Sequence, residues 1–587
     1  MLGAVLMMAW MTAALPEAPR GFTCLGTTLP DEVYTAPIPE GWTEKTIAEA
    51  EPALARRINT VMPDLAPSVR AKGYVVFVRS WGDLVFPQTA PLASELSDSI
   101  RVASPPEEYV AASFSVRALR RLDDVRVTVS DFVGEGGGRI GSEHVDVRVV
   151  RCLPTKIFNK QEYVTRPRVI EKRGAMDVDE GATRQYWLTV HVPASAKPGA
   201  YAATVAVEPR GAPASTLTLD LGVLPFRLRP SPAGHYMYAY MFGNPLREDI
   251  ILKNLVNMRE HGMTGGYFAF GQFPKLKREK GRISVDITSL LSMLEKCRDV
   301  GLVDPIIFNP AVGADDWGDD GFVEILKEIV RQVEGAGLTV PVFTFGDEVD
   351  VSPERTATTA YHLRLIREGL PGVRIYANVV SPSSAALLDS LVDIRAFSSH
   401  ADETTMRAMK NRPHEEFWMY SGPSGYGMAP LEDRLYRGLY VRRMNLSGAG
   451  EWVYQWPLRL RSEPDDPCRD FTLRGPHGNS WDYCLPGRDG PIPSLGWEAY
   501  REGINDGRYI ATLEEAAARA EATDDRAMRE AASAARTYLE RFLARIDLSP
   551  APSTFGTRRE AAKFTNAEID AFRGEVARHI LVLQGAR

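Results

Sequence analysis

The stretch that decides the fold is TVPVFTFGDEVDVSPERTATTAYHLRLIREG, residues 339–369. Its first part is a short run of β-branched and aromatic residues that stops at Gly346, Asp347 and Glu348, and its second part has the apolar spacing of a helix. A strand followed directly by a helix is one βα unit. Two questions follow: how often the unit repeats, and why two adjacent carboxylates stand where its strand ends.

The same unit recurs over about 230 residues, the length typical of a (β/α)8 barrel. The strand candidates are HYMYAYMF, TGGYFAF, PIIFNP, VPVFTFGDE, VRIYANVV, IRAFSSH, EEFWMYSGP and GEWVYQWP, with helical spacing between them. This eightfold alternation predicts a TIM barrel. A doubly wound open sheet is the alternative, but it usually has fewer strands and a glycine-rich phosphate loop after the first one, and MFGNPLRED is not such a loop.

The region before the barrel alternates apolar and polar residues with period two, which predicts a β-sandwich. Residues 186–207, YWLTVHVPASAKPGAYAATVAV, have the pattern of a hairpin with one buried side and a turn at Pro198-Gly199. Residues 136–141 contain a formal GxGxxG, but a strand candidate follows them, so we expect a hairpin loop and no nucleotide site.

The last part of the chain has apolar residues at helical spacing among Glu, Arg and Ala. We therefore predict a multidomain α/β plus all-β protein with four segments. These are a signal-like leader (1–20), an N-terminal β-sandwich region (21–230), a (β/α)8 catalytic barrel (231–492) and a C-terminal helical region (493–587).

The composition of the chain disfavours several classes of binding partner. The chain has 69 basic and 76 acidic residues, a net charge of −7, and no block rich in Lys and Arg, which disfavours a nucleic-acid partner. Residues 2–15 are apolar and resemble a secretory signal, with a buried N-terminal segment as the alternative, and no later run predicts a membrane span. Five cysteines without a CxxC disfavour a zinc site, and Cys468 and Cys484 are equally compatible with a disulfide or free thiols.

In a TIM barrel the site lies at the C-terminal ends of the strands. Those ends carry Tyr240, Phe270, Asn309, Asp347, Glu348, Asn378, His400, Tyr420, Tyr454 and Trp456. Aromatic faces with amides and carboxylates suit a sugar, so we expect a glycan or oligosaccharide substrate, no cofactor and no metal. A structural role is the alternative for His400 and Trp456.

The carboxylate pair itself points to a mechanism. Adjacent strand residues face opposite sides, so Asp347 and Glu348 can serve one site only where the chain bends, as Gly346 permits. Ordinary glycosidases separate their two carboxylates across the scissile bond. Side-by-side carboxylates fit substrate-assisted hydrolysis, in which the 2-acetamido oxygen of the sugar is the nucleophile. Glu348 is then the acid/base and Asp347 the residue that orients the acetamido group; a helix-entry charge pair is the alternative.

The GDE at the fourth strand end, together with LPGRDGPIPSLGWEAYREGINDGRYIATLEE, resembles glycoside hydrolase family 123 and its uncharacterised bacterial relatives. The stretch VPASAKPGAYAATVAV resembles the β-sandwich that precedes the barrel in that group. The resemblance implies a bacterial β-N-acetylgalactosaminidase, and the signal-like leader leads us to expect a secreted or periplasmic location. It also implies that Asp347 stabilises the acetamido group and that Glu348 is the acid/base.

Two positions depart from the family pattern: Val349 replaces the proline of a common Asp-Glu-Pro, and Gly496 replaces the arginine of Arg-Trp-Glu. The resemblance therefore leaves the exact sugar open. Two rival functions remain. One is a glycosidase for a sugar without the acetamido group, which needs a second carboxylate such as Asp402 or Glu403. The other is a non-catalytic carbohydrate-binding protein.

Overall fold

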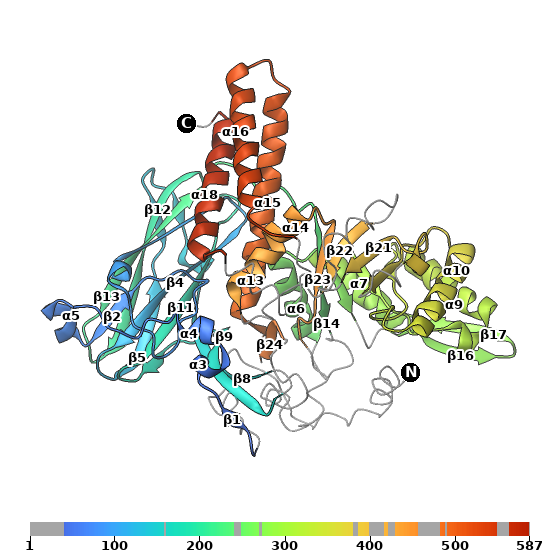
Figure 1. Ribbon diagram of the computed structural model, residues 1–587, viewed down its shortest axis with the longest axis horizontal. Helices are drawn as coiled ribbons and strands as arrows, with labels where there is room; N and C mark the ends of the chain where they lie inside the picture. Colours follow the sequence, from blue (N-terminus) through green and yellow to red (C-terminus); the bar gives the residue numbers. More distant parts are fainter. Residues whose placement is uncertain are drawn as a thin grey trace.

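The computed structural model describes residues 40–157, 160–239, 248–268, 273–379, 386–397, 416–420, 429–455, 482–487, 490–548 and 563–585. In Figure 1 the N-terminal sheets lie on the left and the parallel strands of the barrel on the right. The helices α15 (Leu495–Glu521), α16 (Arg526–Leu543) and α18 (Asn566–Leu583) rise between these two parts. The predicted leader, residues 1–20, lies outside the described residues.

The N-terminal region consists of two sheets. The first has the order β1 (Thr43–Glu44), β9 (Glu162–Glu171), β8 (Val145–Lys156), β11 (Thr183–His191), β4 (Tyr109–Ala118) and β2 (Tyr74–Phe77). The second has the order β10 (Met176–Val178), β5 (Leu122–Val129), β12 (Gly199–Arg210), β13 (Ser215–Val223) and β3 (Ser99–Ser104), with β6 (Phe132–Gly134) also paired to β12 and β7 (Arg139–Ile140) paired to β6. Short helices α3 (Ile47–Ala50), α4 (Pro52–Ala55) and α5 (Pro67–Lys72) precede β2. Both sheets contribute to one buried apolar cluster, and the more specific sandwich assignment stays a prediction.

The hairpin expected over residues 186–207 is wrong. β11 pairs with β4 and β8, whereas β12 pairs with β13, β5 and β6 in the other sheet. The alternation found the buried faces correctly, since Leu188 and Val205 are both fully buried in the shared core. It cannot find the partner strand, because strands that cover one core from two sheets have the same pattern as strands that pair edge to edge. The glycine-rich residues 136–141 form part of the β6–β7 hairpin, as expected: its turn lies between Gly134 and Arg139.

The barrel prediction is confirmed as a nearly closed ring of eight parallel strands. In chain order they are β14 (Gly234–Ala239), β15 (Gly266–Phe268), β18 (Ile306–Phe308), β19 (Val342–Phe343), β20 (Tyr376–Val379), β21 (Ile394–Phe397), β22 (Glu416–Tyr420) and β23 (Gly448–Glu451). A parallel bridge between Phe343 and Ile375 joins β19 to the start of β20. Each of the predicted strand segments overlaps one of these strands, although β14 begins one residue and β23 two residues before the predicted segment.

Two separate clusters of buried residues show which way the barrel side chains face. One cluster contains alternate strand residues, among them Tyr236 and Tyr238 of β14 and Tyr376 of β20, and fills the inside of the ring. The residues between them, such as Met237 and Ala377, belong to a cluster that also contains residues of the surrounding helices. This inside–outside alternation is what a closed sheet requires of every strand.

Helices cover the outside of the ring. They are α6 (Glu248–Glu260), α7 (Thr288–Val300), α8 (Ala314–Trp317), α9 (Asp319–Gly335), α10 (Pro353–Gly369), α13 (Pro430–Leu435), a π-helical turn η4 (Tyr436–Tyr440) and α14 (Val441–Arg443). A β-hairpin of β16 (Lys275–Glu279) and β17 (Arg282–Asp286), which the sequence analysis did not predict, precedes α7 and packs beside α9 at the far edge of the molecule (Figure 1).

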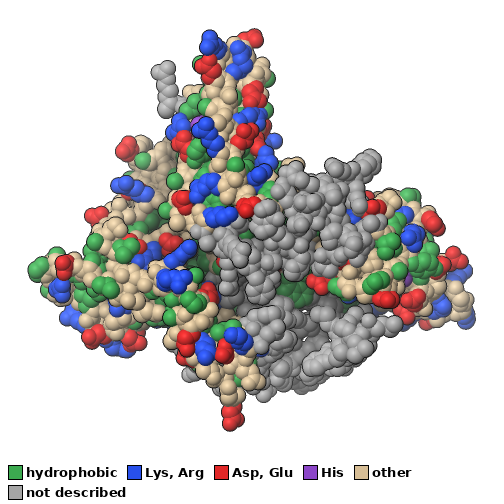
Figure 2. All heavy atoms as spheres, viewed as in Figure 1, with side chains coloured by type: hydrophobic (Ala, Val, Ile, Leu, Met, Phe, Trp, Pro, Cys, Tyr) green, Lys and Arg blue, Asp and Glu red, His purple; other side chains and the backbone are tan. Residues whose placement is uncertain are grey.

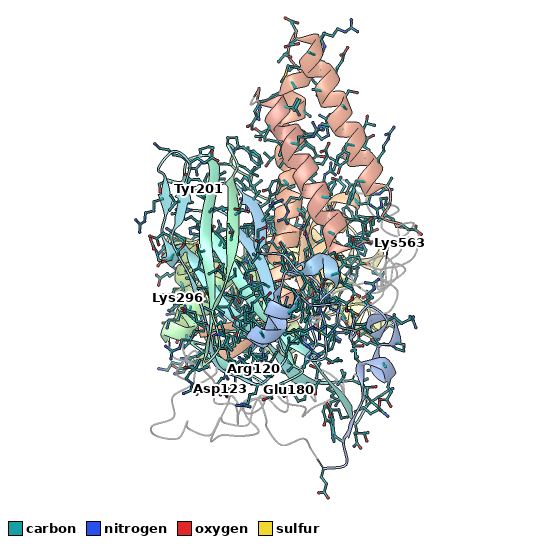
Figure 3. All side chains as sticks on the ribbon, turned by 90° about the vertical axis from the view of Figure 1, so that its left-hand side faces the viewer. Arg120, Asp123, Glu180, Tyr201, Lys296 and Lys563 are labelled. Carbon is teal, nitrogen blue, oxygen red and sulfur yellow. The ribbon has the colours of Figure 1, made fainter. Side chains whose placement is uncertain are left out.

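After the ring, the hairpin β24 (Cys484–Gly487) and β25 (Gly490–Pro493) leads into the predicted helices, which are confirmed as α15, α16 and α18. Their ends project beyond the sheets, past Tyr201 near the upper end of β12 (Figure 3). Acidic and basic side chains are interspersed over this projecting end (Figure 2), with ion pairs such as Arg536–Glu521. Within the described residues, no helix combines the length and apolar character that a bilayer crossing needs.

Candidate active site

The chain bends sharply after β19. Gly346 has φ +139°, and Glu348, although not a glycine, has φ +46°. A left-handed conformation costs an ordinary residue about 1–2 kcal/mol, so neighbouring contacts must hold it. Helix α10 begins directly after the turn, with Pro353 at its first position and the Ser352 Oγ accepting a hydrogen bond from the Arg355 N–H at 3.2 Å. The short connection keeps both carboxylates at the end of the strand.

Asn378, on the neighbouring strand β20, stabilises this turn through hydrogen bonds. Its Nδ2 donates to Asp347 Oδ1 at 2.6 Å, and its Oδ1 accepts the Glu348 N–H at 2.7 Å. Its main-chain oxygen accepts the Val349 N–H at 3.3 Å. Asn378 is almost fully buried and, two residues after the inward-facing Tyr376, lies on the same face of β20. Three consecutive residues of the turn are therefore held by one residue that was predicted from the sequence to contact the substrate.

Asp347 and Glu348 are both exposed, so a ligand can reach them. Protein atoms nevertheless crowd their carboxyl groups, and this loss of solvation raises the pKa of both. For Asp347 the hydrogen bond from Asn378 opposes the rise in pKa; for Glu348 the adjacent charge of Asp347 adds to it. A carboxyl whose pKa is raised holds its proton closer to neutral pH, which suits Glu348 to a general-acid role.

Four buried tyrosines on the inner side of the ring interact electrostatically with Asp347. The hydroxyls of Tyr236 and Tyr376 lie 2.5 Å apart, and the rings of Tyr238 and Tyr267 have centroids 4.1 Å apart. Burial is the main cause that raises the pKa of all these phenols, and the charge of Asp347 contributes to each rise. They are therefore uncharged at neutral pH and give the site a wall of aromatic faces and hydroxyls.

Arg355 is the cation that acts on both carboxylates. It lies in the first turn of α10, and its charge lowers the pKa of Asp347 and of Glu348, against the effect of burial. Among the described residues, its guanidinium makes no hydrogen bond or ion pair. Arg355 was not predicted from the sequence, because it lies in a helix and not at a strand end. Tyr236 and Tyr238 were not predicted either, although their period-two spacing with Tyr240 in HYMYAYMF indicates one shared face of the strand.

Two other predicted residues lie in the same part of the ring. Tyr420 belongs to the inner cluster, with its ring centroid 5.1 Å from that of Tyr238. Asn309 accepts the Ala311 N–H at 2.9 Å, and its side chain forms a hydrogen bond with Tyr267 that opposes the rise in the pKa of this phenol. Both residues therefore contact tyrosines whose pKa is raised by the charge of Asp347.

Tyr454 has a different environment. It is fully buried, its hydroxyl donates to Asn257 Oδ1 of α6 at 3.1 Å, and its ring packs edge-on against Trp497 of α15. It belongs to the cluster between the ring and the helices, so the structure does not bring it together with Asp347. Tyr240, Phe270, His400 and Trp456 lie outside the described residues.

The post-barrel segment GWEAYREG packs against the end of α6. Trp497 Nε1 donates to Asn257 Oδ1 at 2.8 Å, and the Trp497 ring stacks on His261. Glu498 pairs with His261 at 3.1 Å and with Arg501 of the next turn. This segment, the most distinctive part of the family resemblance, therefore makes buried contacts that fix α15 against α6 and α13.

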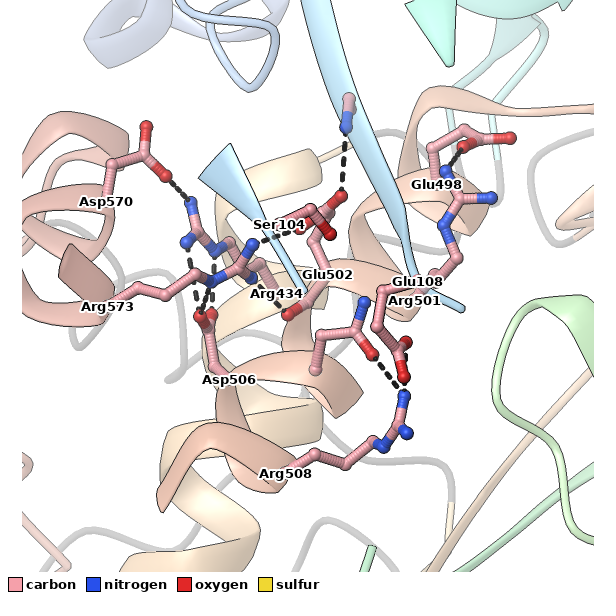
Figure 4. A network of polar contacts seen from close by, with 12 residues as sticks. Ser104, Glu108, Arg434, Glu498, Arg501, Glu502, Asp506, Arg508, Asp570 and Arg573 are labelled. Atoms are coloured by element: carbon pink, nitrogen blue, oxygen red, sulfur yellow. Dashed lines mark hydrogen bonds and ion pairs between the residues drawn. The ribbon is translucent and has the colours of Figure 1, made fainter. Parts of the chain in front are cut away.

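A second buried network continues along α15 (Figure 4). Asp506 accepts hydrogen bonds from Arg434 Nε of α13 at 2.8 Å and from Arg573 Nε of α18 at 2.6 Å. Glu502 pairs with Arg573 and also accepts the Ala111 N–H of β4 at 3.2 Å. These contacts join the sheets, the ring and the C-terminal helices.

No group of three His, Cys, Asp or Glu side chains that could hold a metal ion occurs within the described ranges. Four neighbouring aspartates, Asp315, Asp316, Asp319 and Asp320, lie in the first turns of α8 and α9, where Asp319 accepts the Tyr361 hydroxyl at 2.7 Å. Acidic residues at helix N-termini are favoured by the helix dipole. Cys484 is a free thiol, and Cys468 lies outside the described residues.

Known proteins resemble this chain in sequence over part of its length and in fold over most of it. Residues 83–209 match the family model of the glycoside hydrolase 123 N-terminal domain. A solved family 123 glycoside hydrolase from Clostridium perfringens, described for glycolipid glycan hydrolysis, has a TM-score of 0.67 at 14% identity, over 87% of this chain and 100% of that chain. A putative β-galactosidase from Bacteroides fragilis has a TM-score of 0.31 at 11% identity, over 73% of this chain and 60% of that chain. No curated protein sequence matches.

The predicted resemblance to family 123 is therefore confirmed, in sequence for residues 83–209 and in fold for most of the chain. At 14% identity the structural likeness shows a common fold.

Proposed function

We propose that this chain is a glycoside hydrolase that removes a β-linked 2-acetamido sugar, N-acetylgalactosamine being the first choice, by a substrate-assisted retaining mechanism. The supporting observation is the adjacent pair Asp347 and Glu348 at the end of β19, locked by Asn378 in a fold that resembles family 123. A glycan or oligosaccharide is the corresponding partner.

The adjacency of the pair favours this mechanism over the two-carboxylate mechanisms. Those place their carboxyls about 5–5.5 Å or 6.5–9.5 Å apart on either side of the glycosidic bond. Asp347 and Glu348 are chain neighbours, and both side chains leave the same strand end. Such a pair is suited to serve two atoms on one side of the sugar.

In the proposed mechanism Glu348 first donates a proton and later accepts one. Glu348 donates its proton to the glycosidic oxygen while the acetamido oxygen forms a bond to the anomeric carbon and the bond to the leaving group breaks. Asp347 accepts a hydrogen bond from the acetamido N–H through Oδ2, since Oδ1 is bound by Asn378. Glu348 then takes a proton from the water that attacks the anomeric carbon, and the acetamido group is restored.

The rival mechanism needs a second carboxylate facing the site. Glu451 ends β23, but it is fully buried and paired with Arg437, and it alternates with inward-facing positions. The charge of Glu451 is therefore paired with Arg437 on the outside of the ring. Asp402 and Glu403, the candidates that the sequence suggested, lie outside the described residues.

Substrate-binding roles are proposed for Asn309 and Tyr420 because they are grouped with the tyrosines around Asp347. An aromatic ring beside hydroxyl and amide groups can contact the apolar face of a sugar and its hydroxyl rim. The roles of Tyr240, His400 and Trp456 remain proposals from the sequence. So does a secreted or periplasmic location, which an N-terminal sequence determination on protein from fractionated cells would test.

The decisive experiment measures nitrophenol release from matched β-galactoside, N-acetyl-β-galactosaminide and N-acetyl-β-glucosaminide substrates. We expect turnover of acetamido sugars alone, a kcat loss of at least about 100-fold in Glu348→Gln, and a similar loss in Asp347→Asn. Turnover of the plain galactoside would contradict the substrate-assisted mechanism. If all three are inert, oligosaccharides from glycolipids are the next substrates, since the similar Clostridium perfringens protein is described for glycolipid glycan hydrolysis.

A further inference from the structure

We propose that Asn378 is a positioning residue, which orients the Asp347 carboxylate and holds the turn that aims Glu348 at the substrate. The inference rests on the proposed function and replaces the direct substrate contact that the strand-end pattern predicted for Asn378. It rests on three hydrogen bonds that Asn378 makes with three consecutive residues of the turn, two through its side chain and one through its main-chain oxygen.

The hydrogen-bonding capacity of Asn378 is largely used by these contacts. A side-chain amide has one oxygen and two N–H groups. Here the oxygen accepts the Glu348 N–H at 2.7 Å and one N–H donates to Asp347 at 2.6 Å. The orientation of the amide is unambiguous, because a backbone N–H only donates and an ionised carboxylate only accepts. With 1% of its surface exposed, Asn378 is placed to act through the pair and not on the sugar.

No other common side chain reproduces this arrangement. Aspartate has the same shape but lacks the donor when ionised, leucine has the shape without polar atoms, and glutamine extends one carbon further. Loss of the oxygen would also leave the N–H of Glu348, held at φ +46°, without its partner. Since that conformation is costly for a non-glycine residue, the turn would be expected to relax.

The electrostatic surroundings make the donor important. Burial disfavours the charged form of Asp347, and Glu348 and the phenols of Tyr236, Tyr238, Tyr267 and Tyr376 supply no positive charge. Asp350 adds a negative charge near Glu348. Among the described residues, the Asn378 N–H is the largest influence that favours the ionised carboxylate, followed by the Arg355 charge and the Glu348 backbone N–H. An orienter that accepts the acetamido N–H must be ionised, so this donor serves the proposed role directly.

The test compares Asn378→Asp and Asn378→Leu across pH. In Asn378→Asp the introduced carboxyl has the donor and acceptor of the asparagine when it is protonated, whereas its ionised form repels Asp347. We therefore expect Asn378→Asp to lose about 100-fold in kcat/KM at pH 8, the range of a charge-assisted hydrogen bond, and to recover part of it relative to wild type as the pH falls to 5. Asn378→Leu should be impaired at both pH values.

Asn254→Asp is the matched control. Asn254 is an equally buried asparagine, on α6, and its Nδ2 donates to Gln455 Oε1 at 3.3 Å instead of to a carboxylate. It should show no acid recovery. Loss of activity in Asn378→Asp that is confined to KM and does not vary with pH would overturn the proposal in favour of substrate contact, and unchanged kinetics in both Asn378 variants would overturn it as well.

A crystal structure of Asn378→Leu separates this proposal from the proposed function, because it needs no turnover. We expect Glu348 to leave its positive φ and Asp347 to change rotamer. An unchanged turn at residues 346–349 would refute the positioning role even if the wild type hydrolyses acetamido sugars. A rearranged turn in a protein inert towards every substrate would refute the proposed function and retain the role of Asn378 in the turn.

Discussion

Single residues set the charge state of the site. Asp347 and Glu348 lie in surroundings that disfavour their ionisation, and two groups from different elements oppose this effect. Asn378 acts on Asp347 through a hydrogen bond, whereas Arg355 acts on both carboxylates through its charge. The balance matters because the proposed mechanism needs one carboxyl ionised and the other protonated over the same pH range.

Replacement of Arg355 by methionine is expected to move the pH profile of kcat/KM to higher pH. The cation lowers the pKa of both carboxyls, so its removal lets both values rise. The acid limb, set by ionisation of Asp347, and the alkaline limb, set by deprotonation of Glu348, should shift in the same direction. Arg364→Met, at an exposed arginine on the same helix, is the control. A profile that stays in place would show that Arg355 does not set these ionisations.

At the scale of elements, the first half of α15 makes the most consequential contacts. Its residues 495–506 are all buried, and Glu498 is held between Arg501 and His261 of the α6 end. Burial alone would raise the pKa of Glu498, but these two partners outweigh it and lower the value to about 2. The ion pair between Glu498 and His261 therefore holds α15 against the end of α6 in the folded protein.

The low pKa of Glu498 predicts that the free energy of unfolding falls in acid. A carboxyl with a pKa of about 2 in the folded chain and 4.5 when unfolded stabilises the folded state fully above pH 4.5 and loses that contribution as the pH falls towards 2. The loss amounts to about 3 kcal/mol. Glu498→Gln should lower the urea midpoint at pH 7 and reduce its change between pH 5 and 3. Glu540→Gln, at an exposed position of α16, should change neither.

At the scale of the whole molecule, buried ion pairs connect its three parts. Arg434 of α13 and Arg573 of α18 share Asp506 of α15, and Glu502 of α15 binds the backbone of β4 (Figure 4). Buried pairs of this kind contribute little net stability against an apolar replacement, but the loss of one partner leaves uncompensated charges. The sheets, the ring and the helices should therefore unfold together.

Asp506→Asn is expected to destabilise the protein by about 3–5 kcal/mol, because two buried guanidinium groups lose their shared carboxylate. In calorimetry, the wild type should show one transition, and the variant a lower midpoint and a broader or divided transition. Asp524→Asn, at an exposed residue before α16, should change stability by less than about 0.5 kcal/mol. Equal midpoints for the two variants would contradict the coupling of the parts.

The chain order of strands and helices and the position of the carboxylate pair were available from the sequence. Apolar alternation, helical spacing and Gly346 are local properties, because each depends on residues that are near one another along the chain. They located the eight barrel strands, the last helices and the pair Asp347–Glu348. They also suggested Asn378, since it follows a strand, although for a different role.

The choice of partners was decided only by the tertiary structure. Alternation shows which face of β11 and β12 is buried but not that they belong to different sheets. Likewise, nothing local to Tyr454 distinguishes a strand end that faces the ring from one that faces α6. The sequence by itself determined that a strand ends in two carboxylates, because adjacency is covalent. Only the packing of β20 against β19 brought Asn378 to them, because a contact between residues far apart in the chain depends on which surfaces the folded core brings together.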